Sequence, residues 1–76
     1  MKEQLEAIIQ SIVMNPDAVV IEEKQKEEVT VFEVTVANED MGKVIGKEGR
    51  IAKSIRTVMR AVAMKENSKI SIEFLG

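Results

Sequence analysis

The sequence predicts an α+β domain with the element order α-β-β-α-α-β, built as a three-stranded mixed sheet with three helices on one face. Two observations carry this prediction. Apolar residues recur at helical spacing near the N-terminus and over residues 51–62, and they alternate with polar residues over 29–37 and 69–75. The chain has 76 residues, which is enough for one domain, so residues 1–76 are expected to fold as a single unit.

The first helix is predicted over about residues 2–14. One helical face is apolar, and its residues are Leu5, Ile8, Ile9, Ile12 and Val13. We expect Pro16 to end the helix, because the residue before a proline, here Asn15, is biased away from helical torsions.

A β-hairpin is predicted next. Residues 18–24 are short and β-branched, residues 24–28 form a polar turn, and residues 29–37 alternate between apolar and polar side chains. The inward face of this second strand is formed by Phe32, Val34 and Val36. Val31 falls on the polar face.

Two helices and a last strand complete the order. Asn38 or Asp40 is expected to cap the first of these helices, which is cut short at Gly46, and the second begins after Gly49. The apolar stripe of the second helix is Ile51, Ile55, Val58, Met59 and Val62. It ends near residues 66–69, and residues 69–75 alternate as a strand. The inward side chains of that strand are Ile70, Ile72 and Phe74.

The composition excludes several classes of function. The chain contains no His, Cys, Tyr or Trp, so disulfides, thiolate metal sites and the usual zinc ligands are absent, and its serines have no histidine to activate them. We therefore expect a protein that is not an enzyme and needs no cofactor or metal. No apolar run approaches the ~20 residues that span a bilayer, and the acidic N-terminal stretch does not resemble a signal peptide. The expected location is the cytoplasm, without membrane attachment.

Charge is distributed unevenly along the chain. The formal net charge is −2, which by itself argues against a nucleic-acid partner. However, residues 1–40 carry ten acids and three bases, whereas residues 43–60 carry six bases and one acid. One end of the fold is therefore predicted to be locally basic, and it is the end that contains the glycines.

The stretch GKVIGKEGR, residues 42–50, allows two interpretations. In the first it is only a joint between helices, with Gly46 supplying a positive φ and Gly49 easing entry to the next helix. In the second its backbone N–H groups, the following helix N-terminus and its cations bind phosphate. The glycine spacing matches neither a P-loop nor a dinucleotide fingerprint. It does match G-x-x-G between two helices, the loop with which KH domains clamp about four nucleotides.

The surrounding residues strengthen this match. VIGKEGRIAKSI, residues 44–55, resembles the KH pattern V-I-G-x-x-G-x-x-I-x-x-I, and the element order is that of a type II KH domain. Residues 39–63, together with NPDAVVIEE and KISIEFL, resemble the bacterial KhpA family of small single-KH-domain RNA-binding proteins. The resemblance implies a cytoplasmic RNA chaperone in post-transcriptional control, linked to cell shape and cell-wall homeostasis. It also implies three partners: single-stranded RNA, a second copy of the chain, and the larger KH-domain protein KhpB, also called Jag.

The KH pattern also assigns candidate RNA-binding residues. Gly46, Lys47, Glu48 and Gly49 form the clamp, and Arg50 faces the same phosphates from the next helix. The full predicted set is Lys43, Ile45, Gly46, Lys47, Glu48, Gly49, Arg50 and Lys53. Glu48 departs from the most basic versions of the loop, so we expect weak, salt-sensitive binding.

Two features of the predicted site keep alternatives open. Ile45 is either a base contact or a core residue, and the strip Lys53, Arg56 and Arg60 is either a binding surface or a solvated helix face. Both aromatics, Phe32 and Phe74, are expected in the core, which removes a base-stacking platform.

A patch for self-association is expected at Thr57, Ala61 and Met64. The alternative function is a protein-interaction or scaffold subunit whose partner supplies most of the RNA contact.

Overall fold

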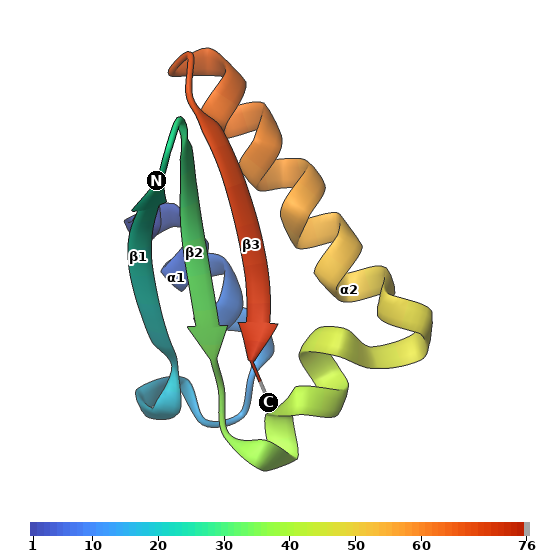
Figure 1. Ribbon diagram of the computed structural model, residues 1–76. Coiled ribbons are helices and arrows are strands. Elements are labelled where there is room, and N and C mark those ends of the chain that lie inside the picture. Colours follow the sequence, from blue (N-terminus) through green and yellow to red (C-terminus); the bar gives the residue numbers. More distant parts are fainter. Residues whose placement is uncertain (76) are drawn as a thin grey trace.

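The computed structural model describes residues 1–75, except for the side chains at positions 47 and 48. The elements in chain order are helix α1 (Lys2–Ile12), the 3-10 helix η1 (Pro16–Ala18), strands β1 (Val20–Lys26) and β2 (Val29–Thr35), helix α2 (Asn38–Lys65) and strand β3 (Lys69–Leu75). Figure 1 shows α1 behind the sheet and the long upper part of α2 running beside β3. The predicted α+β architecture is confirmed.

The three strands form one mixed sheet in the order β1-β2-β3. β1 pairs with β2 in the antiparallel sense, so that Ile21 lies opposite Val34, and β2 pairs with β3 in the parallel sense, so that Val34 also lies opposite Phe74. The predicted inward residues Phe32, Val34, Val36 and Ile72 are buried, and this register brings the inward rows of the strands to the face that the helices cover.

The core joins this face of the sheet to α1 and α2. Its buried side chains are Leu5, Ile9, Val13, Val19, Ile21, Phe32, Val34, Val36, Val44, Ile55, Met59 and Ile72. Burial of each large apolar side chain contributes about 1.5–3 kcal/mol, and it offsets the loss of chain entropy on folding. The helical stripe predicted for α1 lies in this core or packs against it.

Several element boundaries differ from the prediction, and β2 ends at Thr35 rather than at residue 37. α1 ends at Ile12 rather than near residue 14, because Val13 takes extended torsions and the chain then enters η1, which was not predicted. The polar turn is shorter than residues 24–28, because both strands continue to a two-residue hairpin. Glu27 in that hairpin has a φ of 54°, the left-handed conformation that a tight turn between twisted strands requires.

The two helices predicted on either side of the glycines appear as two arms of α2. The helical assignment is continuous from Asn38 to Lys65, but Gly49 within it has a φ of +75°. Figure 1 shows the helix axis turning sharply in this yellow part of the ribbon. We call residues 38–48 the first arm and residues 50–65 the second arm. The positive φ lies at Gly49 and not at Gly46, where the joint interpretation placed it.

The second arm buries a different stripe from the predicted one. Its buried residues are Ala52, Ile55, Met59 and Ala63, whereas Val58 is 50% exposed. The buried face of the arm is thus rotated relative to the predicted one and includes two alanines, whose small side chains allow close packing of a helix. This rotation moves Val58 to the surface and brings Arg56 toward the edge of the sheet.

The predicted cap of α2 is also wrong. Ala37 occupies the N-cap position, and no side chain there accepts a hydrogen bond from the helix. Asp40 is fully buried and binds a different part of the chain, so its carboxylate is not available to the first turn of its own helix.

Candidate nucleic-acid interface

The bend in α2 is positioned by the residue that precedes the glycine turn. Val44 is fully buried and fixes the first arm to the core, while the next residue, Ile45, is 43% exposed. The structure therefore excludes Ile45 as a core residue and leaves it available for an apolar contact at the surface. An exposed isoleucine is a suitable contact for the apolar face of a nucleobase.

The glycines of the turn have different structural requirements. Gly49 adopts a φ of +75°, which side chains with a Cβ rarely tolerate, so the bend itself requires a glycine there. Gly46 has no positive φ, and a Cβ added to it would meet no atom within 4 Å. The fold does not require glycine at position 46. A bare backbone there keeps the surface open for close approach from outside.

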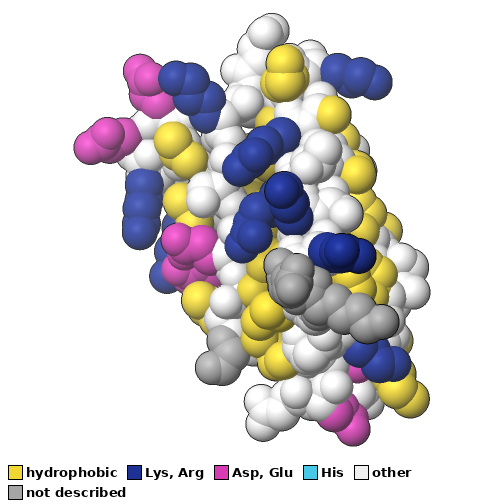
Figure 2. Space-filling model, turned by 90° about the vertical axis from the view of Figure 1, so that its right-hand side faces the viewer, with side chains coloured by type: hydrophobic (Ala, Val, Ile, Leu, Met, Phe, Trp, Pro, Cys, Tyr) yellow, Lys and Arg dark blue, Asp and Glu magenta, His cyan; other side chains and the backbone are white. Residues whose placement is uncertain are grey.

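Three of the predicted cations lie around this bend. Lys43, Arg50 and Lys53 are exposed, and Figure 2 shows basic side chains gathered along this face of α2. Within the described part of the chain the one salt bridge is Lys24–Glu33 on the sheet, so none of these three cations forms a salt bridge with a described carboxylate. Their charge is available to an anion. The roles predicted for Lys47 and Glu48 lie outside the described side chains.

Arg56 is a surface cation that the sequence prediction did not assign to the site. Its Nε donates a hydrogen bond to the Ile72 carbonyl at 3.1 Å, and its guanidinium lies 5.4 Å from the centre of the Phe74 ring. These contacts hold it against β3, an edge strand of the sheet. The sequence placed Arg56 only in the basic strip with Lys53 and Arg60, and nothing in that strip indicated its contact with β3.

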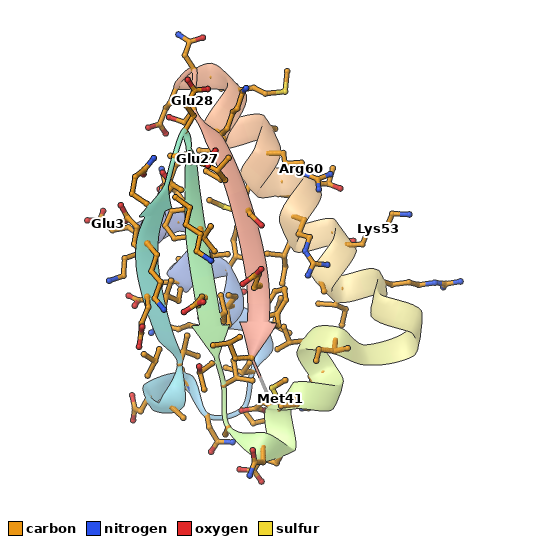
Figure 3. All side chains as sticks on the ribbon, in the orientation of Figure 1. Glu3, Glu27, Glu28, Met41, Lys53 and Arg60 are labelled. Carbon is orange, nitrogen blue, oxygen red and sulfur yellow. The ribbon has the colours of Figure 1, made fainter. Side chains whose placement is uncertain are left out.

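Arg56 and Arg60 border a shallow hollow at the edge of β3. The hollow measures about 80 Å³, and β3 contributes residues 70–72 to its wall. Figure 3 shows Lys53 and Arg60 pointing away from the sheet on the outer side of the second arm. The basic strip of this arm therefore has two parts, one cation fixed against β3 and two that extend into solvent.

Asp40 fixes the first arm to the loop that follows α1. Its carboxylate accepts hydrogen bonds from the backbone N–H groups of Met14 and Asn15, both at 3.0 Å, and from Nδ2 of Asn15 at 3.0 Å. The hydrogen bond from the Met14 N–H is the main cause that holds the pKa of Asp40 below its ordinary value. Asp40 thereby joins the loop after α1 to the first turn of α2, the helix that carries the bend and its cations.

The described residues offer few other kinds of site. Among them no three metal-ligating side chains gather closely enough to hold an ion. None of the described helices combines the length and the apolar character that crossing a bilayer requires. The features that stand out are the bend, its exposed cations and the β3 edge beside them.

Comparison with known proteins agrees with this geometry. The family model described as "KhpA/KhpB, KH domain" matches residues 2–74. A protein from Clostridium acetobutylicum named RNA-binding protein KhpA is 52% identical over 75 residues, which cover 99% of this chain and 100% of the relative. Proteins of the same name from Chlamydia trachomatis and Listeria monocytogenes are 44% and 41% identical, covering 99% of this chain and 96% and 99% of the relatives.

Proposed function

The chain belongs to the KhpA/KhpB KH-domain family, and from this premise we propose that it binds single-stranded RNA by clamping the sugar–phosphate backbone at the bend of α2. The observation that carries the proposal is the position of Gly46 and Gly49 among three exposed cations without a described carboxylate partner. Glycine allows the RNA backbone to approach the peptide closely, and the cations neutralise its phosphates.

Base contacts would come from aliphatic and backbone groups. Phe32 is 1% exposed and Phe74 lies beneath Arg56, so neither described aromatic ring offers an open face. The remaining surface beside the bend is Ile45 and the edge of β3 with Arg56. Recognition therefore rests on apolar contact and on hydrogen bonds to base edges, which favours single strands whose bases are free.

We expect the binding of RNA to weaken strongly with salt. Neutralisation of about three phosphates gives a slope of roughly −2 in log K against log salt for a single strand, so that affinity falls about tenfold or more between 50 and 200 mM salt. The measurement is fluorescence anisotropy of a labelled, unstructured RNA over a salt series. A duplex of the same sequence serves as the control, since its bases are not free to reach Ile45 and β3. Affinity for the single strand that did not change with salt would contradict a phosphate clamp.

Self-association of the chain is the second part of the proposal. Thr57, Ala61 and Met64 are exposed on the second arm, and Met64 is 76% exposed. The structure adds Val58, which is half exposed on the same arm. An apolar strip of this kind on a small domain favours contact with a second copy, and two linked clamps raise the effective concentration of one strand.

Substitution of Val58→Asp is expected to convert a dimer to a monomer without unfolding the domain, because a charge buried in an apolar contact is costly whereas the monomer leaves it in water. Analytical ultracentrifugation measures the change. Val20→Asp is the matched control, since Val20 is 51% exposed on the sheet and is not on the second arm. An unchanged sedimentation coefficient in the Val58 variant of a dimeric protein would exclude this strip as the contact.

The resemblance to KhpA proteins supports three further elements of the proposal. They are RNA chaperone activity in the cytoplasm, pairing with a larger KH-domain protein of the KhpB type, and a role in cell shape and cell-wall homeostasis. The clamp is compatible with the first of these because weak, salt-sensitive contacts to the backbone allow a strand to exchange rapidly.

A further inference from the structure

A second hollow lies beside the bend, between the first arm, the start of the second arm and the end of α1. It measures about 480 Å³, and its lining residues are Ile12, Gly42, Lys43, Gly46, Arg50 and Ile51. Ile12 and Ile51 are partly buried apolar residues that pack against the core. The hollow thus has an apolar base and two cations in its wall. None of its described lining residues is acidic.

Gly42 gives an independent indication that this hollow is used. It lies inside a helix, where glycine costs about 0.5–1 kcal/mol relative to alanine. No positive φ requires glycine at this position, and a Cβ added there would meet nothing within 4 Å. The fold therefore gains nothing from the missing side chain. Gly42 and Gly46 are one helical turn apart, so together they leave a strip of bare backbone facing outward.

We propose that this hollow is a nucleotide subsite that extends the RNA contact from the clamp toward α1. A nucleotide is complementary to this lining, because its base has a flat apolar face and its phosphate is an anion that Lys43 or Arg50 can bind. Bare helix backbone at the two glycines allows a flat ring to lie close to the arm. Gly46 and Arg50 belong to both the clamp and the hollow, so one continuous strand reaches both.

This inference rests on the proposed function and adds a length requirement. The clamp alone accounts for about four nucleotides, so a strand of that length does not need the hollow. A longer strand gains affinity by placing a further base against Ile12 and Ile51. We expect the wild-type protein to bind an eight-nucleotide oligouridine more tightly than a four-nucleotide one, and substitution Gly42→Leu to reduce this gain by at least about threefold.

Two controls separate loss of the subsite from loss of the fold. Gly42→Ala favours helix and should leave the thermal midpoint unchanged or raised, while its methyl group narrows the hollow and lowers the gain with RNA length. Gln4→Leu adds the same apolar side chain to an exposed position of α1 away from the hollow, and it should keep the wild-type gain.

The methyl NMR signal of Ile12 tests the subsite without relying on a variant. We expect the eight-nucleotide strand to shift this signal and the four-nucleotide strand to leave it in place. An Ile12 signal that neither strand moves, or a Gly42→Leu protein with the full gain in affinity, overturns the subsite while the clamp stands. A wild-type protein that binds neither strand overturns the proposed function itself.

Discussion

Replacement of Lys47 and Glu48 by aspartate is expected to reduce RNA affinity by about 30-fold or more. The double substitution changes the charge of the turn by two units, and each unit is worth ~1 kcal/mol beside a phosphate in water. It leaves Gly46 and Gly49 in place, so the bend, which requires a glycine at position 49, is retained. Fluorescence anisotropy with a single-stranded RNA measures the loss, and circular dichroism checks that the fold is unchanged.

The chain offers a matched control for this variant. Lys2 and Glu3 form another Lys-Glu pair, exposed at the start of α1, and Figure 3 shows Glu3 on the opposite side of the molecule from Lys53. Replacement of this pair by aspartate changes the net charge equally, so it should weaken RNA binding only through the long-range field. Equal losses in both variants would contradict a local clamp at the bend.

The same experiment distinguishes the clamp from a scaffold function. If the bend holds RNA, the Lys47 and Glu48 variant loses RNA but still associates with protein partners. A variant that keeps its RNA affinity and loses a protein partner would favour the alternative, in which the partner supplies the RNA contact. The exposed strip on the second arm is separate from the turn, so the two properties can be changed independently.

The sequence predicted the sheet well because its signals are local. Alternation over residues 29–37 and 69–75 identified which side chains face the helices, and the register confirms them. Helix boundaries were less accurate where another part of the chain decides them. α1 ends early because its following loop binds Asp40, a residue 25 positions away from Asn15. No pattern within α1 contains that information.

For the candidate site, too, the local features could be predicted from the sequence and the features that depend on packing could not. The glycine spacing and the cations of residues 43–53 were visible as a motif, and the structure places their described members around one bend. Periodicity alone put Val58 in the core and Arg56 in a general basic strip. Their actual positions depend on how the second arm packs, with Ala52 and Ala63 buried and Val58 exposed. A hydrophobicity pattern gives alanine too little weight to show this.

The contact between Asp40 and the loop after α1 is expected to be the most important polar interaction for stability. Asp40→Ala leaves the backbone N–H groups of Met14 and Asn15 without their acceptor inside the fold, and unpaired amides are costly when buried. We expect the midpoint of thermal unfolding to fall by about 10 °C or more, since a domain of this size shifts by roughly 4–8 °C for each kcal/mol. Differential scanning calorimetry measures the shift.

Acid should remove the stability that the Asp40 carboxylate contributes in the wild-type protein. The folded structure lowers the pKa of Asp40, chiefly through the hydrogen bond from Met14, so the charged carboxylate is favoured in the folded state. Its contribution is complete above the ordinary aspartate pKa of about 3.9 and is lost as the pH falls through the lower folded value. The stability difference between wild type and Asp40→Asn should therefore be constant near neutral pH and shrink below about pH 4.

Asp17→Asn supplies the matched comparison, because Asp17 is an exposed aspartate in η1 with no hydrogen bond to its side chain in the described structure. Its substitution should change the thermal midpoint little at any pH. If Asp40→Asn behaved like Asp17→Asn, the loop and the first arm would be held by apolar packing alone. In the expected case, loss of the Asp40 carboxylate loosens the first arm. RNA affinity then falls as well, because the cations near the bend lose their fixed position.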